Sequence, residues 1–246
     1  MESFEERIRA GEKMLAVLLD PENVKQENVP RILDKIHESV CTHILIGGST
    51  VSDDATELLV KAIKSNSHLP VIIFPGHPNQ ICENADALLF LSLISGRNSD
   101  YLIGKHVEAA SILKNLDIEV IPSSYLLIGD NGSAVEKVSN TSPMSVDNIE
   151  TIIDTALAGK LLGHKCTYLE AGSGAKNPVK NEIILRIKET VQHPLIVGGG
   201  IRNLEGINDA YTAGADMVVI GTSFEDDIDF FHKNQLVKSS IKTNLI

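Results

Sequence analysis

Short apolar runs alternate along this chain with longer segments whose apolar residues recur at helical spacing. The short runs are rich in Val, Ile and Leu, which is typical of strands that are buried on both faces of a parallel sheet. We therefore expect strands at residues 14–19, 43–47, 71–74, 87–91, 119–121 or 125–128, 167–170, 195–197 and 217–220.

The segments between these runs predict helices. In residues 146–162, apolar side chains recur at steps of three and four, which places them on one buried face. Gly163 and Gly214 follow two of the expected helices, at the position where a glycine commonly ends a helix. We expect helices at residues 53–64, 100–116, 146–162, 179–191 and 203–213.

About eight strand–helix units in 246 residues favour a closed (β/α)8 barrel of the TIM type over an open sheet, because such a barrel needs roughly 250 residues. The α/β pattern runs through residues 1–246 without a linker or repeat, so we expect a single phosphate-binding barrel domain. It is weakest at residues 71–91, where only 79–83 remain for a helix, and we expect the barrel to be modified at this third unit. Residues 119–142 are expected to be irregular.

The charge balance narrows the choice of partners. The chain has 33 Asp and Glu against 22 Lys and Arg, a formal net charge of -11, which disfavours binding to nucleic acid or an anionic membrane. No apolar run reaches the roughly 18 residues that span a bilayer, and the charged start of the chain does not resemble a signal peptide. Cys41, Cys82 and Cys166 lie far apart in the sequence. We expect them to be buried thiols of a cytoplasmic protein.

Glycines follow the last three expected strands, and in a barrel such strand ends form the functional face. Glycine lets the backbone approach a ligand closely, and its N–H groups bind anions without any lysine. The alternative is that these are only tight turns. Because they occur at three consecutive strand ends, we expect a phosphate site there, formed by residues 172–174, 198–200 and 221–222.

Asp20 follows the first expected strand, and we expect it to face Ser49 or Thr50 after the second. Carboxylate and hydroxyl oxygens of this kind suit Mg²⁺, which completes its shell with substrate phosphate and water. An Asp-Pro turn or a helix cap is the alternative explanation for Asp20. The glycine-rich face opposite favours the metal site.

Glu170 ends the sixth expected strand, beside the glycines. A buried carboxylate is costly unless it has a partner or a role, and here it could accept the proton of a substrate hydroxyl. The alternative is a structural salt bridge, for example to Arg202. His77 is expected to be a solvent-exposed loop residue.

Six motifs in this order resemble the geranylgeranylglyceryl phosphate synthase family, with its bacterial heptaprenylglyceryl phosphate synthase relatives. The resemblance covers residues 14–222. The sequences that carry it are Leu-Asp-Pro at 19–21, Ile-Gly-Gly-Ser at 46–49, Phe-Pro-Gly at 74–76, Tyr-Leu-Glu-Ala-Gly-Ser-Gly-Ala at 168–175, Val-Gly-Gly-Gly-Ile-Arg at 197–202 and Gly-Thr at 221–222.

The resemblance implies a prenyltransferase of polar lipid biosynthesis that joins sn-glycerol 1-phosphate to geranylgeranyl diphosphate through an ether bond. It implies Mg²⁺ at Asp20 and Ser49, catalysis by Glu170 and Asp20, a homo-oligomer of two or more copies, and a product that partitions into the membrane. Some archaeal members carry a lysine where this chain has Leu18, so that contact is not transferred. The implied substrate-binding residues are Tyr168, Leu169, Glu170, Ala171, Gly172, Ser173, Gly174, Gly199, Gly200, Gly221 and Thr222.

Three other functions remain open on the same barrel. A metal-independent phosphosugar isomerase would use Asp20 and Glu170 as an acid–base pair. A flavin-binding barrel would place the flavin phosphate on the glycines, and a non-catalytic protein would only bind a phosphorylated lipid precursor. The length of the prenyl chain would depend on side chains that close an apolar groove, for which residues 91–101 are the candidates.

Overall fold

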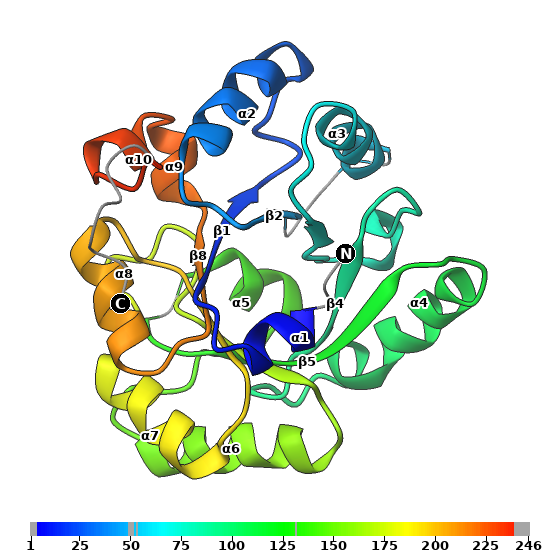
Figure 1. Cartoon of the computed structure of the whole chain (residues 1–246). Helices are drawn as coiled ribbons and strands as arrows, with labels where there is room; N and C mark the ends of the chain where they lie inside the picture. The colour runs from blue at the N-terminus through cyan, green and yellow to red at the C-terminus, as the bar shows by residue number, and fades with distance from the viewer. Residues whose placement is uncertain (1–3, 49–51, 53, 131, 239–246) are drawn as a thin grey trace.

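The fold is a closed barrel of eight parallel strands (Figure 1). Its structure is a computed structural model that describes residues 4–48, 52, 54–130 and 132–238. Each strand pairs with the next in sequence, and β8 closes the barrel on β1, with Met14 beside Met217. The strands are β1 (Met14–Leu19), β2 (His43–Ile46), β3 (Val71–Ile73), β4 (Ala87–Ser92), β5 (Glu119–Leu127), β6 (Cys166–Glu170), β7 (Leu195–Gly198) and β8 (Met217–Ile220). The predicted TIM-type fold is confirmed.

Helices surround the strands, and all five predicted helices are present with slightly different ends. Asp53, the first residue of one predicted helix, lies outside the described residues. A further helix at Val29–Glu38 was not expected, although Val29, Ile32, Leu33 and Ile36 form its buried face at helical spacing. The helices are α1 (Phe4–Arg9), α2 (Val29–Glu38), α3 (Ala55–Lys64), α4 (Lys105–Leu113), α5 (Ala134–Ser139), α6 (Ile149–Leu161), α7 (Asn181–Val191), α8 (Leu204–Thr212), α9 (Thr222–Asp226) and α10 (Phe230–Lys233).

The third strand–helix unit departs from the regular pattern, as the sequence predicted. Between β3 and β4 the chain forms only the short 3-10 turn η2 (Pro78–Gln80) where other units carry an α-helix. A second short turn, η1 (Gln26–Asn28), precedes α2, and a π-helical turn, η3 (Asp100–Gly104), leads into α4. The layer outside β3 and β4 therefore lacks the α-helix that the third unit would supply.

The strand expected at residues 119–121 or 125–128 is present, whereas the expectation that residues 119–142 are irregular is wrong. Residues 119–127 form the nine-residue strand β5, and residues 134–139 form α5. Pro122, Ser123 and Ser124 interrupt the apolar run, which is why the sequence indicated two short alternatives in place of one long strand. The two serines are nevertheless buried, because Ser123 Oγ lies 3.2 Å from Cys166 Sγ and Ser124 Oγ lies 2.7 Å from His164 Nδ1.

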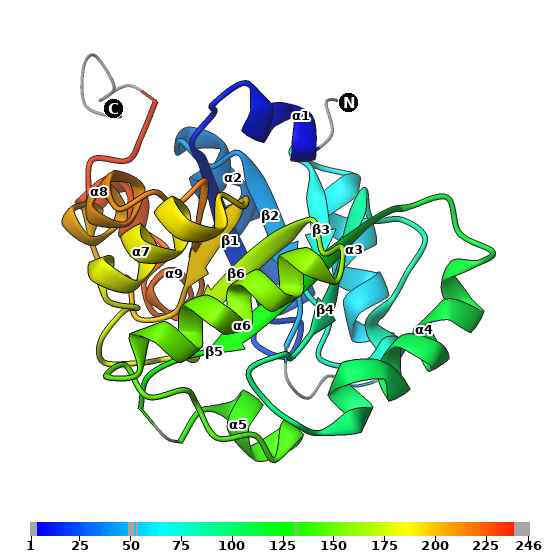
Figure 2. The same ribbon diagram turned by 90° about the horizontal axis from the view of Figure 1, so that it is seen from below.

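Alternate residues of each strand point to opposite sides of the barrel wall. One buried cluster fills the barrel interior and includes Met14, Leu45, Leu89 and Met217. A second cluster lies between the strands and the helices. Phe4 of α1 packs into the interior cluster, and Figure 2 shows α1 at one end of the barrel and α5 at the other. The end closed by α1 is therefore not the functional end.

The three cysteines are buried thiols, as the sequence predicted. Cys41, Cys82 and Cys166 are buried and form no disulfide. Burial raises the pKa of the Cys41 thiol to about 12, so this thiol stays protonated. Among the described residues, no helix has the length and apolar character required to cross a bilayer.

Candidate active site

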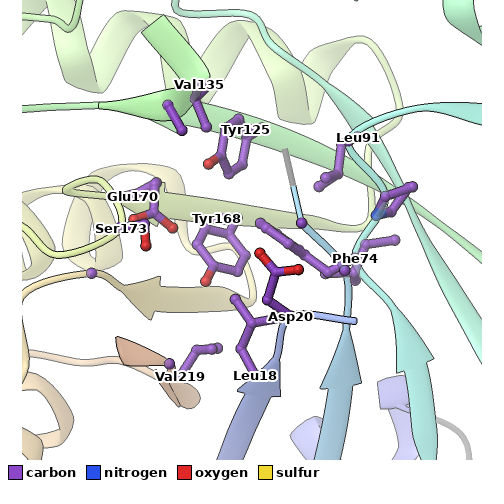
Figure 3. A pocket seen from close by; sticks show the side chains of 18 of the residues that line it. Leu18, Asp20, Phe74, Leu91, Tyr125, Val135, Tyr168, Glu170, Ser173 and Val219 are labelled. Atoms are coloured by element: carbon purple, nitrogen blue, oxygen red, sulfur yellow. The ribbon is translucent and has the colours of Figure 1, made fainter. Parts of the chain in front are cut away.

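A cavity of about 320 Å³ opens at the carboxyl ends of the strands, which is the functional end of barrels of this type. Figure 3 shows Tyr168 and Glu170 pointing into it from β6, and Asp20 from the end of β1. The cavity combines a polar part, beneath the loops after β6, β7 and β8, with an apolar part beside β4.

The glycines at the ends of β6 and β7 adopt backbone conformations that other residues rarely reach. Gly172, Gly174, Gly199 and Gly200 all have positive φ, from +69° to +105°. A Cβ atom at Gly199 would lie 2.5 Å from Glu170 Oε1, and one at Gly200 would lie 2.6 Å from the Asn177 carbonyl oxygen. Both the conformation and the space therefore require glycine.

The three glycine-containing loops converge at one side of the cavity. Ser173, Gly174, Gly199, Gly200, Gly221 and Thr222 all line it. Ser173 Oγ lies 3.3 Å from Thr222 Oγ1, which joins the loop after β6 to the loop after β8. The structure thus brings the predicted phosphate-binding segments together, with small residues and hydroxyls facing one space.

Glu170 is the most deeply buried carboxylate of the cavity, with 6% of its surface exposed. Burial raises its pKa to about 7, although the Gly172 N–H, 2.7 Å from Oε1, and the Tyr168 hydroxyl donate hydrogen bonds to it. Arg202 instead donates to the Ala175 carbonyl oxygen at 3.1 Å. The alternative of a salt bridge between Glu170 and Arg202 is wrong, and Glu170 is available to a ligand.

Asp20 follows β1 and lines the cavity. Its Oδ1 atom accepts a hydrogen bond from the Glu22 N–H at 3.0 Å, and partial burial raises its pKa. A Cβ atom at Gly48 would lie 2.6 Å from both carboxylate oxygens, so glycine at this position gives the carboxylate its space. Ser49, the second predicted metal ligand, lies outside the described residues, as does Thr50.

The residues of β6 divide between the two sides of the barrel wall. Tyr168 and Glu170 point inward and line the cavity. The side chains of Leu169 and Ala171 belong to the cluster between strands and helices, and Gly172 is not among the lining residues. If these three residues contact a substrate, they do so through their backbone.

Three aromatic rings form the boundary between the polar and the apolar part. The centroids of Phe74 and Tyr168 are 5.0 Å apart, those of Tyr125 and Tyr168 5.5 Å, and those of Phe74 and Tyr125 5.8 Å. Burial and the Glu170 carboxylate raise the pKa of both tyrosine hydroxyls well above its ordinary value, so both remain neutral donors.

Beyond these rings the cavity continues along β4 as an apolar groove. Leu88 and Phe90, two residues apart on the strand, line it together with Ile81 and Ala109. This is the sector that a third helix would cover in a regular barrel. Of the predicted groove segment 91–101, three residues line the cavity: Leu91, Leu93 and Tyr101.

Other residues of the cavity were not expected from the sequence. Glu225 accepts a hydrogen bond from the Asp20 N–H at 2.8 Å, although 205 positions separate the two residues. Burial raises the pKa of Glu225. His77 is exposed, as predicted, but it also lines the cavity, beside Lys105. Nothing in local spacing indicates these contacts, because each joins two distant loops.

The chain matches the PcrB family over residues 7–239. A geranylgeranylglyceryl phosphate synthase of Flavobacterium johnsoniae is 53% identical over 222 residues, which cover 90% of this chain and 91% of that protein. A protein of the same name from Methanopyrus kandleri is 41% identical over 212 residues, or 86% and 88% of the two chains.

The fold is similar to the crystal structure of (S)-3-O-geranylgeranylglyceryl phosphate synthase from Thermoplasma acidophilum in complex with its substrate sn-glycerol-1-phosphate. The TM-score is 0.90 at 34% identity, and the match covers 98% of this chain and 99% of that one. The similarity therefore extends over the whole barrel and includes the loops that surround the cavity.

Proposed function

The chain belongs to the PcrB family, and from this membership we propose that it transfers a geranylgeranyl group from its diphosphate to sn-glycerol 1-phosphate. The reaction forms an ether bond and releases diphosphate, as a step of polar lipid biosynthesis. The observation that carries this proposal is that one cavity is lined by the buried Glu170, by glycines of the loops after β6, β7 and β8, and by apolar side chains along β4.

The glycine loops bind the phosphate of the acceptor. Backbone N–H groups around Gly199 and Gly200, with the hydroxyls of Ser173 and Thr222, offer donors to a phosphate without a charged side chain among them. With its phosphate held there, the glycerol part extends toward Tyr168 and Glu170. Fixing the acceptor in this way turns the transfer into a reaction of neighbouring groups.

Glu170 orients the attacking hydroxyl of glycerol phosphate and accepts its proton. The oxygen of this hydroxyl forms a bond to the first carbon of the prenyl chain, while the bond from that carbon to the diphosphate oxygen breaks. The electron pair of the broken bond leaves with the diphosphate. A carboxylate whose pKa is near the working pH is well suited to accept the proton.

The groove along β4 holds the prenyl chain. Its lining by Leu88, Phe90, Ile81 and Ala109 matches a hydrocarbon that has no hydrogen-bonding groups. The aromatic rings of Phe74, Tyr125 and Tyr168 lie where the groove meets the polar part, so the reactive carbon would lie near them.

Asp20 fits a magnesium ion. Its carboxylate lines the cavity, carries a pKa raised by partial burial, and has a further oxygen beyond the one that accepts from Glu22. Ser49 is the second proposed ligand. When bound, Mg²⁺ neutralises charge on the departing diphosphate. Among the described residues there is no group of three or more His, Cys, Asp or Glu that could hold a metal, so substrate oxygens and water would complete the shell.

The proposal extends to the setting of the enzyme. We infer that the domain spans residues 1–246, works in the cytoplasm and forms a homo-oligomer of two or more copies. Its product carries a hydrocarbon chain and partitions into the membrane.

A radiolabelled transfer assay tests the function. Labelled sn-glycerol 1-phosphate and geranylgeranyl diphosphate are incubated with the protein, once with Mg²⁺ and once with a chelator. We expect an ether-linked product that forms only with Mg²⁺. Binding of glycerol phosphate without any product would instead support the phosphosugar isomerase or the non-catalytic binder, and a yellow purified protein would support the flavin-binding barrel.

The substitution Gly199→Ala is expected to raise the KM for sn-glycerol 1-phosphate about 10- to 100-fold. The added Cβ would lie 2.5 Å from Glu170 Oε1 and would strain a backbone at φ +81°. Gly163→Ala is the matched control, because Gly163 has φ +93° and open space around its Cβ position outside the cavity. Steady-state kinetics give the KM of both variants. An equal rise in KM in the two would show that backbone strain alone causes the effect.

The rate is expected to depend on the ionisation of Glu170. Because burial raises this pKa to about 7, kcat/KM for the acceptor should rise with pH and level off above about 7. Below that pH the rate should fall about tenfold per unit as the carboxylate is protonated. A pH–rate profile measured between about 5 and 9 checks this, and a profile without a step near 7 would contradict the base assignment.

A further inference from the structure

Positive charge is scarce in the cavity. Of the described residues that line it, the Lys and Arg residues are Lys105 and Arg202, against the carboxylates of Asp20, Glu170 and Glu225. The proposed reaction brings two phosphorylated substrates into this space. Each cation of the lining therefore bears directly on how the substrates are held.

Arg202 is already engaged on the glycerol phosphate side. Its guanidinium donates to the carbonyl oxygen of Ala175, which follows the glycine loop of β6. Its role is thus to hold the phosphate-binding loop in place. On the β1 side of the cavity, Leu18 lines the wall and offers no charge. Lys105 is the cation that remains for the second substrate.

Lys105 begins α4 and stands at the entrance of the apolar groove. Its Nζ atom lies 3.1 Å from His77 Nε2, which connects α4 to the turn η2. Gln80, in the same turn, donates from Nε2 to the Gly48 carbonyl oxygen at 2.8 Å. Gly48 lies against the Asp20 carboxylate. This series of contacts joins Asp20 to Lys105 along one rim of the cavity.

The Lys105 ammonium can exchange its present partners for a ligand at a small cost in free energy. Its ion pair with Glu108, at 3.2 Å, joins residues three positions apart on the helix surface, and the Glu108 side chain is 54% exposed. Such exposed pairs contribute little to stability. The other partner, His77 Nε2, is an imidazole nitrogen on an exposed side chain. A phosphate oxygen is a stronger partner for an ammonium group than either.

We propose that Lys105 binds the diphosphate of the prenyl donor, on the opposite side of that group from Asp20. This assignment rests on the proposed function. It places the charged head of the donor on the rim between Asp20 and Lys105, with the hydrocarbon chain passing beside Lys105 into the groove along β4.

Replacing Lys105 with Met tests the assignment, because Met retains an apolar stem and removes the charge. We expect the KM for geranylgeranyl diphosphate to rise about 10- to 100-fold, the typical effect of losing one charge-assisted hydrogen bond. Inorganic pyrophosphate with Mg²⁺, measured by calorimetry, should bind more weakly by a similar factor. The KM for sn-glycerol 1-phosphate should stay unchanged, and Lys105→Arg should restore most of the donor affinity.

Two controls separate charge from shape. Lys114→Met removes an exposed lysine at the end of the same helix and should change neither constant. Geranylgeraniol, which lacks the diphosphate, should inhibit the Lys105→Met variant as well as it inhibits the original chain. Unchanged pyrophosphate binding in Lys105→Met, or an equal loss of geranylgeraniol binding, would overturn the assignment.

The two proposals fail in different ways. If the original chain makes no ether product but binds pyrophosphate in a manner that depends on Lys105, the proposed function is wrong and the anion site stands. If the chain makes the product but pyrophosphate binds equally well to the Lys105→Met variant, the function stands and the Lys105 assignment is wrong.

Discussion

Replacing Glu170 with Gln is expected to lower turnover about 10²- to 10⁴-fold, the usual contribution of a positioned general base. Gln has the same shape and keeps an oxygen for the Gly172 N–H, but it cannot accept the proton of the substrate hydroxyl. The affinity for sn-glycerol 1-phosphate should stay nearly unchanged, because the glycine loops hold the phosphate. Single-turnover rates and calorimetry with the acceptor measure the two quantities separately.

The stability of this variant provides the folding control. Burial raises the pKa of Glu170 from 4.5 to about 7, so the protonated carboxyl stabilises the fold below pH 4.5, and this contribution is lost as the pH rises through 7. At pH 8 the ionised carboxylate costs up to about 3 kcal/mol, which Gln removes. Thermal unfolding at pH 8 should therefore show Glu170→Gln to be at least as stable as the original chain. A stable variant with normal turnover would remove Glu170 from the mechanism.

Replacing Asp20 with Asn is expected to lower activity at limiting Mg²⁺ about 10²-fold or more, since a neutral amide oxygen is a poor ligand for this ion. The Asn side chain still accepts from the Glu22 N–H, so the loop should keep its conformation. The measurement is the Mg²⁺ concentration that gives half-maximal activity, which should rise steeply in the variant.

Glu27→Gln is a suitable control for Asp20→Asn. It also removes one negative charge from the connection between β1 and α2, but at an exposed side chain outside the cavity. Its Mg²⁺ response should match that of the original chain. A normal Mg²⁺ response in Asp20→Asn itself would show that the ion binds elsewhere.

The sequence predicted the barrel because its strands are nearly continuous apolar runs, and a run of this kind identifies a buried parallel strand without any tertiary information. Asp20 and Glu170 could be singled out for the same reason, since Asp20 directly follows a recognisable strand and Glu170 ends one. The loss of the third helix was also visible, as too few residues separate β3 from β4.

The parts that the sequence did not predict depend on contacts between distant segments. In β5, Ser123 and Ser124 are buried through hydrogen bonds to side chains about 40 positions away, so the sequence indicated only the apolar segments on either side of them. Glu225 and Lys105 enter the cavity only because the barrel closes and the loops meet. Helix α2 is different, because its apolar spacing is present in the sequence itself.

Because no α-helix follows β3, the hydrophobic layer outside the strands is incomplete at this place in the protein. In the other sectors of the barrel, residues of the chain fill the layer outside the strands, but beside Leu88 and Phe90 that layer is open to the cavity. Under the proposed function, the hydrocarbon tail of the donor occupies this layer and acts as a removable part of the core. A ligand that binds only the folded state stabilises it, so each catalytic cycle also adds and removes part of the hydrophobic packing.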